Sequence, residues 1–221
     1  MGDLDKELMA ECEDLFELPR GFCDSLLQEN DYVFVVQTHA LLEVVLTRLI
    51  VLVLLHPAIE EAKADIEHII HRLEMSNPQT GKLAFAKALG ILDDEERRFL
   101  RNFSELRNAL VHYVNNVTYD IHTFVNTLDE RQFSDWIRKF SSGTDTDLKE
   151  AMSPLVRARI RQRPKEYLWD GAMGVLAWVV LFITRGIEHN RFIEKHQAFH
   201  DVLAEVSKQA AQDEQGRNGT H

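Results

Sequence analysis

The residue types best suited to chemistry lie together in the middle of the chain, in the stretch ELRNALVHY at positions 105–113. Arg107 is followed by Asn108, and His112 comes five residues after the arginine. Histidine exchanges protons near neutral pH because its unperturbed pKa is about 6.5. Arginine stays charged and offers forked N–H donors to the crowded oxygens of a phosphorane-like transition state. These residue types therefore suit proton transfer next to a phosphate group.

The surrounding pattern predicts that these residues lie on a helix. Asp93 and Glu96 have the spacing of a capping box, and Leu92 supplies the hydrophobic residue before it. The helix that begins there carries an apolar stripe made of Phe99, Phe103, Leu106, Leu110 and Val114. Five residues turn a straight helix through about 140°, so Arg107 and His112 do not share a face. A second copy of the chain removes this difficulty by completing the site at an interface, and the spacing therefore favours a homodimer.

An arginine with a polar neighbour, three mostly apolar residues and then a histidine resembles the signature of HEPN domains (higher eukaryotes and prokaryotes nucleotide-binding). The stretch KLAFAKALGILDDEE at positions 82–96 looks like the equivalent region of HEPN proteins related to the mannitol operon repressor family. The resemblance covers roughly residues 24–114. It implies an all-α helical bundle that commonly dimerises around a cleft. In members that cut RNA, it also implies metal-independent cleavage through the ribose 2′-hydroxyl.

The resemblance implies a role for each residue of the motif. Arg107 stabilises phosphate charge, and His112 acts as acid or base. Asn108 orients the substrate or the histidine. The resemblance also implies a polar supporting residue on the first long helix, and Glu43 is the candidate that would orient Arg107. An ion pair of Glu43 with Arg48 is an equally good interpretation of the same residue.

Other interpretations of the motif stay open. Arg107 and His112 also fit a cation that offsets the helix dipole and a capping or interface histidine. Many HEPN domains keep the fold as binding modules without cleavage. Some HEPN toxins carry a tyrosine two residues after the histidine, where a partner nucleotidyltransferase modifies it. Here Val114 takes that position, and the supporting candidate Tyr113 comes one residue earlier.

One dense basic run precedes and follows Pro164, and it consists of Arg157, Arg159, Arg161, Arg163 and Lys165. Alternate spacing places these residues around a helix rather than along one stripe, which favours an extended or fraying segment before the proline. One interpretation is a strip of RNA phosphate contacts beside the cleft. The other is a solvated connector that offsets nearby acidic residues.

Hydrophobic periodicity, caps and breakers predict helices throughout the chain. The expected helices cover residues 24–55, 58–75, 81–89, 93–114, 129–140, a long apolar segment from Pro164, and a His- and Glu-rich segment to about 208. We expect one HEPN-like helical domain over residues 1–208, with its core at about 24–115 and 164–188 and additional C-terminal helices. The polar tail 209–221 is expected to be disordered.

Composition narrows the classes of function. The net charge of −11 excludes indiscriminate coating of nucleic acid. Two cysteines are too few for a disulfide scaffold or a zinc site, and the acidic N-terminus is unlike an export signal, so a cytoplasmic location is expected. The apolar runs 41–55 and 171–184 are broken by charge or short of about 20 residues, which favours buried helices and no membrane. Neither a metal ligand set nor a glycine-rich phosphate loop is found, so no metal or cofactor is expected.

These observations lead to two hypotheses. The first is a metal-independent HEPN endoribonuclease that acts as a homodimer, as a toxin or antiviral effector. The alternative is a non-catalytic HEPN module that serves as a transcriptional regulator or partner-binding subunit, similar to the mannitol repressor group. The candidate partners are RNA and a second protein, an antitoxin or a regulator.

Overall fold

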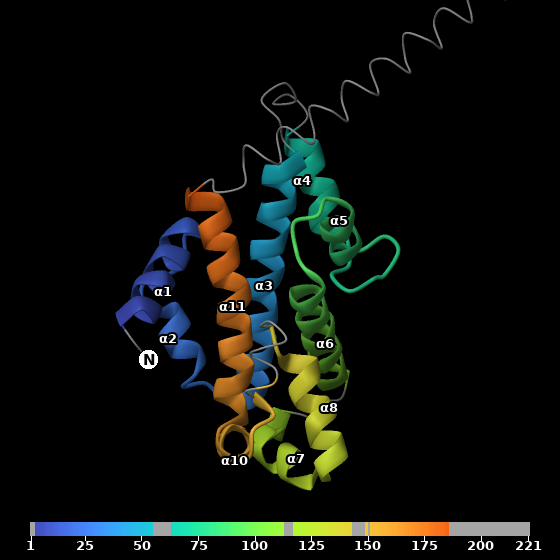
Figure 1. Ribbon diagram of the computed structural model, residues 1–221. Helices are drawn as coiled ribbons and strands as arrows, with labels where there is room; N and C mark the ends of the chain where they lie inside the picture. The colour runs from blue at the N-terminus through green and yellow to red at the C-terminus, as the bar shows by residue number, and fades with distance from the viewer. Residues whose placement is uncertain (1–2, 55–62, 113–116, 143–148, 150, 186–221) are drawn as a thin grey trace, which may run out of the picture. The chain divides into compact units, whose positions relative to one another are not determined.

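The structure is a computed structural model that describes residues 3–54, 63–112, 117–142, 149 and 151–185. This part of the chain is helical and contains no strand, which confirms the all-α class. The helices are α1 (Asp3–Leu15), α2 (Phe22–Leu26), α3 (Asp31–Leu54), α4 (Lys63–Arg72), α5 (Lys82–Ala88), α6 (Asp94–Val111), α7 (Ile121–Thr127), α8 (Glu130–Phe140), α10 (Pro154–Gln162) and α11 (Pro164–Arg185) (Figure 1). The chain divides into two compact units, residues 1–180 and 181–221, and all of these helices except the end of α11 lie in the first.

The long apolar helix α3 is enclosed by other helices along most of its length. Its buried residues include Phe34, Leu42, Val45, Leu49 and Ile50. The single helix expected over 24–55 is wrong at its start, because α2 ends at Leu26 and α3 begins at Asp31. The side chain of Asn30 accepts a hydrogen bond from the N–H of Val33 (3.0 Å), and this bond caps α3 and separates it from α2.

Helix α6 begins where the capping box predicts. Asp93 is the N-cap, and its N–H donates to the carboxylate of Glu96 (2.6 Å). The helix then runs without interruption to Val111, and His112 is its C-cap. Its buried face consists of Phe99, Leu100, Phe103, Ser104 and Leu110.

Aromatic side chains join α6 to α8 and α11. The ring of Phe99 lies edge-on to Phe140, with ring centroids 6.4 Å apart. Gly171 of α11 lies directly against these two residues, because a Cβ atom there would overlap the Phe99 ring and lie 2.9 Å from the carbonyl oxygen of Phe140. Close approach of α11 to α6 and α8 therefore depends on the missing side chain of Gly171.

The expected helices 81–89 and 129–140 are confirmed as α5 and α8, and the long apolar helix begins at Pro164 as α11. Helix α1 and the two short helices α7 and α10 were not expected. The expectation of an extended or fraying segment before Pro164 is wrong, because α10 begins at Pro154 and continues to Gln162. The expected helix to residue 208 and the tail 209–221 lie outside the described residues. The helix expected over 58–75 is described only from residue 63, as α4, which ends at Arg72.

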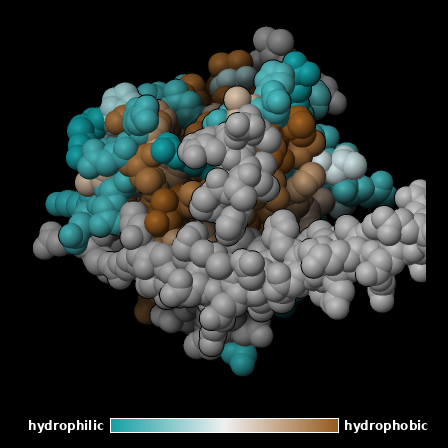
Figure 2. Space-filling view, turned by 90° about the horizontal axis from the view of Figure 1, so that it is seen from above, coloured by the Kyte–Doolittle hydropathy of each residue, from teal (hydrophilic) through white to brown (hydrophobic). Residues whose placement is uncertain are grey.

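Two helices are long and apolar enough to meet the length and composition test for a membrane span, Asp31–Leu54 and Pro164–Ile183. The window in α3 is 61% buried inside the bundle and the window in α11 is 44% buried, so the core helix of a soluble protein would pass the same test. Apolar side chains also show on the end of the molecule viewed in Figure 2. Leu52 of α3 and Ile69 of α4 are among the exposed apolar residues.

Substitution of Gly171 tests the packing of α11. Gly171→Ala is expected to lower the free energy of unfolding by about 2 kcal/mol or more, because its Cβ meets a ring and a backbone carbonyl that cannot both move away. Gly174→Ala is the matched control on the same helix. Its Cβ meets only the rotatable hydroxyl of Ser142, so this variant is expected to stay within about 1 kcal/mol of the wild type. Urea titration compares the two variants, and equal losses would contradict the proposed packing.

Candidate functional site

Arg107 and Asn108 are joined to each other on α6. One terminal nitrogen of the Arg107 guanidinium donates to the side-chain oxygen of Asn108 (2.9 Å). Both side chains are half-buried, and the Nε of Arg107 is buried with no hydrogen-bond partner among the residues that the structure describes. Asn108 therefore restricts the orientation of the guanidinium.

His112 occupies a different environment at the end of the same helix. It is exposed, and its backbone N–H donates to the carbonyl of Asn108 (3.3 Å), as in a continuing helix. Because α6 is regular up to Val111, the angle of about 140° expected between Arg107 and His112 is retained. One chain alone does not bring these two side chains onto one face. Tyr113 lies outside the described residues.

A polar cluster between α3, α5 and α6 adjoins Arg107, and it consists of His39, Glu43, Lys82 and Ser104. The Lys82 ammonium is almost completely buried and lies 2.5 Å from one carboxylate oxygen of Glu43. The other oxygen of Glu43 is 3.9 Å from Nδ1 of His39. On the far side of the ring, Nε2 of His39 is 3.2 Å from the hydroxyl oxygen of Ser104. The cluster thus satisfies polar groups that the three helices bury together.

The charges around His39 show how Arg107 relates to this cluster. Burial lowers the pKa of His39 to about 4, against the opposing effect of the Glu43 carboxylate. The positive charges of Arg107 and Lys82 contribute to the same lowering of the pKa of His39. His39 is therefore neutral near pH 7, and Arg107 lies within electrostatic reach of it.

Glu43 has partners other than those expected from the sequence. Its carboxylate pairs with Lys82 and His39, and neither an ion pair nor a hydrogen bond with Arg107 or Arg48 occurs among the described residues. Lys82 and Ser104 were missed as members of the cluster. A signal for Ser104 existed, because this serine follows Leu100 by four residues on the buried face of α6, where a polar side chain needs a partner.

Two arginines of the basic run hold α10 against the neighbouring helices. The guanidinium groups of Arg157 and Arg161 lie 5.0 and 4.0 Å from the ring centroid of Phe133. Both pair with Glu130, at 2.5 and 2.8 Å, and these hydrogen bonds lower the pKa of its carboxyl group. Arg161 also donates to the carbonyl of Val125 (3.2 Å). These contacts support a structural role for both residues.

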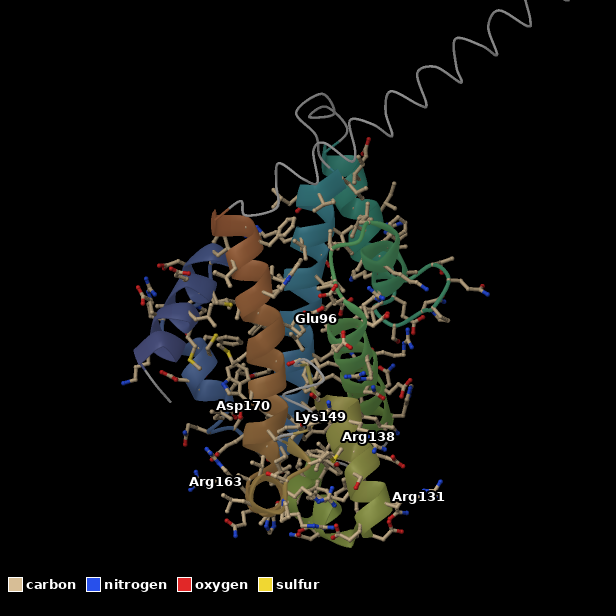
Figure 3. All side chains as sticks on the ribbon, in the orientation of Figure 1. Glu96, Arg131, Arg138, Lys149, Arg163 and Asp170 are labelled. Carbon is tan, nitrogen blue, oxygen red and sulfur yellow. The ribbon has the colours of Figure 1, made fainter. Side chains whose placement is uncertain are left out.

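The remaining three residues of the basic run differ in exposure. Lys165 pairs with Asp31 (3.3 Å) at the end of the bundle where α3 and α11 both begin. Arg163 is exposed at the junction of α10 and α11 (Figure 3) and pairs with Glu166 (3.2 Å). Arg159 is exposed, and its side chain makes no hydrogen bond or ion pair within the described ranges. Only Arg159 and Arg163 of this run therefore present their charge to solvent.

The described residues hold no group of three or more His, Cys, Asp or Glu side chains that could bind a metal ion. The histidines of the His- and Glu-rich segment, His189, His196 and His200, lie outside the described residues. No protein-family model, no curated protein and no solved structure matches the chain.

Burial of neutral His39 predicts a specific pH dependence of stability. The unfolded histidine binds a proton below its ordinary pKa of 6.5, whereas the folded one does so only below about 4. Between these values the unfolded state binds more protons, so stability is lost as the pH falls from 6.5 to 4. The contribution of His39 to this loss is at most about 3 kcal/mol.

In His39→Gln, this part of the pH dependence is expected to disappear while the curve above pH 6.5 keeps its shape. His71→Gln, which changes an exposed histidine of α4, should retain the wild-type slope. Urea unfolding at several pH values measures both. An unchanged slope in His39→Gln would contradict the burial of a neutral imidazole.

A pair of arginine variants tests the structural role of α10. Arg161→Ala removes the contact with Phe133 and the bonds to Glu130 and Val125, so the free energy of unfolding should fall by about 2 kcal/mol. Arg159→Ala removes the same charge from an exposed position and should change stability by less than about 0.5 kcal/mol. Equal effects of the two variants in thermal and urea unfolding would count against the structural role.

Proposed function

We propose that this protein is a HEPN-like helical bundle that cuts RNA without a metal ion and acts as a homodimer, as a toxin or antiviral effector. The observation that carries the proposal is the orientation of Arg107 and the exposure of His112 on α6. The guanidinium of Arg107 is oriented by Asn108, and the imidazole of His112 is exposed at the end of the same helix. A charged fork and an accessible imidazole are the two groups that cleavage next to a ribose 2′-hydroxyl needs.

The proposed reaction uses these groups on the scissile phosphate. His112 accepts the proton of the ribose 2′-hydroxyl while water donates a proton to the departing 5′ oxygen, or His112 donates that proton while water accepts the one from the 2′-hydroxyl. Arg107 donates to the non-bridging oxygens, where negative charge accumulates in the transition state. The 2′ oxygen forms a bond to phosphorus as the bond to the 5′ oxygen breaks. The expected products are a 2′,3′-cyclic phosphate and a 5′-hydroxyl end.

The regular geometry of α6 is the reason that the proposal includes two chains. Arg107 is half-buried beside the His39 cluster, whereas His112 projects at about 140° around the helix axis. A dimer related by a two-fold axis places the same surface of each copy against the other. Arg107 of one chain and His112 of its twin can then serve one phosphate.

A second candidate function is a non-catalytic HEPN module that regulates transcription or binds a protein partner. The observation that favours it is that most residues of the basic run form ion pairs within the protein. Arg157, Arg161 and Lys165 pair with Glu130 and Asp31, and the net charge of the whole chain is −11. Such a module would bind another protein or a small ligand tightly and would not degrade RNA.

The ribonuclease proposal predicts that His112→Ala abolishes cleavage of RNA and leaves the fold intact, since His112 is exposed at a helix end. Loss of a general acid or base should lower the rate about 10²- to 10⁴-fold. The assay uses labelled single-stranded and folded RNA in excess chelator, with circular dichroism and thermal unfolding as checks of folding. His71→Ala, in which an exposed histidine of α4 is changed, is the matched control with wild-type activity.

Two further outcomes separate the candidates. RNA that carries a 2′-deoxyribose at the cleavage position should resist the wild-type enzyme, because it lacks the attacking hydroxyl. Undiminished cleavage by His112→Ala would end the ribonuclease proposal. If the wild type shows no cleavage and recovers a tight protein complex, the binding module is the correct function.

A further inference from the structure

The two cysteines of the chain face each other in the corner formed by α1 and α2. Cys12 of α1 and Cys23 of α2 are both free thiols with no exposed surface. Each thiol shifts the pKa of the other, as expected for side chains that lie next to each other. The two helices that carry them are neighbours at the N-terminal end of the chain (Figure 1). Neither thiol has a part in the function proposed for α6.

The backbone around the two thiols is held by a buried carboxylate. Glu13, next to Cys12, accepts one hydrogen bond from the N–H of Cys23 (2.9 Å) and one from the N–H of Gly21 (2.9 Å). The carbonyl of Glu13 also accepts from the N–H of Leu18 (2.8 Å). Gly21 has a φ of 80°, in the left-handed region that glycine adopts without strain. These bonds hold the start of α2 against α1, and none of them involves a thiol group.

We propose that Cys12 and Cys23 form a reversible intramolecular disulfide when the protein meets a hydroperoxide. Two buried thiols on neighbouring helices, whose backbones Glu13 already holds together, need only small movements to reach bonding distance. The inference stands on the position of the two side chains and is independent of whether the protein cuts RNA.

The environment of the two thiols determines which of them reacts with the peroxide first. The hydrogen bond from Cys23 lowers the pKa of Cys12, while the same interaction and burial raise the pKa of Cys23. Cys12 is therefore the thiol that ionises and attacks first. A sulfur–oxygen bond forms as the peroxide oxygen–oxygen bond breaks, and the released hydroxide takes up the proton of Cys12 to leave as water.

The second step closes the disulfide. The sulfur of Cys23 attacks the sulfur of the resulting sulfenic acid, the sulfur–oxygen bond breaks, and a second water leaves with the proton of Cys23. The two thiols lose two electrons in total, and the peroxide gains them to become two molecules of water. Because both sulfurs are buried, the peroxide reaches them through local opening of the corner between α1 and α2.

The link would attach α1 covalently to α2. It closes a short loop between Cys12 and Cys23, which limits the conformations of the unfolded chain and restrains separation of α1. The expected result is a more stable N-terminal corner under oxidising conditions.

The test uses the full chain, reduced first and then treated with hydrogen peroxide after removal of the reductant. Peptide mapping without reductant should find the peptide with Cys12 joined to the peptide with Cys23, with the loss of two hydrogen atoms. Size-exclusion chromatography should show no covalent oligomer. Dithiothreitol should restore both thiols, and the oxidised form should melt about 5 °C higher than the reduced form.

Single variants resolve the order of the steps. Cys23→Ser should accumulate a sulfenic acid on Cys12, which dimedone traps, whereas Cys12→Ser should leave Cys23 largely unreacted. Wild-type mapping decides the proposal even if a variant fails to fold. Oxidation that joins two chains, stops at single sulfinic acids or leaves both thiols free in folded protein would overturn the proposal.

Discussion

The enclosure of α3 is the constraint on which the rest of the bundle depends. This helix is too apolar to face water, yet it carries His39 and Glu43 one turn apart in its middle. Burying that turn requires partners, and α5 supplies Lys82 while α6 supplies Ser104. The polar contacts therefore fix which turns of α5 and α6 lie against α3. Because Arg107 is less than one turn beyond Ser104, the same contacts set the position of the guanidinium.

The sequence predicted the starts of α6 and α8, where residues close together in the chain form the N-cap. The N–H of Asp93 donates to the side chain of Glu96, and the side chain of Asp129 accepts from the N–H of Gln132, so both caps could be identified from a spacing of three residues. The break between α2 and α3 was missed because both sides of it are helix-forming and only the cap at Asn30 separates them. Helix α10 was missed because alternating arginines show no apolar stripe. Its stability comes from a ring, Phe133, that precedes it by more than twenty residues.

For the candidate site, the sequence also predicted the residues and their helix geometry but not their tertiary partners. The angle between Arg107 and His112 follows from helix geometry alone, and the uninterrupted α6 retains it. The partner of Glu43 could not be predicted, because Lys82 lies 39 positions away and meets it only through packing of α5 on α3. The charge of Arg157 and Arg161 was equally visible in the sequence, but their commitment to Glu130 depends on tertiary structure. Sequence thus identified the groups, and packing determined which of them remain available.

In the proposed function two chains serve one phosphate, and mixed dimers test this most directly. Two differently tagged chains, Arg107→Ala and His112→Ala, are co-expressed, and the mixed dimer is isolated through both tags. In a shared site, the intact arginine of one chain meets the intact histidine of the other, so one of two sites is restored. The account predicts that the mixed dimer cuts RNA at about half the wild-type rate while each parent dimer is inactive. A mixed dimer as inactive as its parents would contradict the shared site.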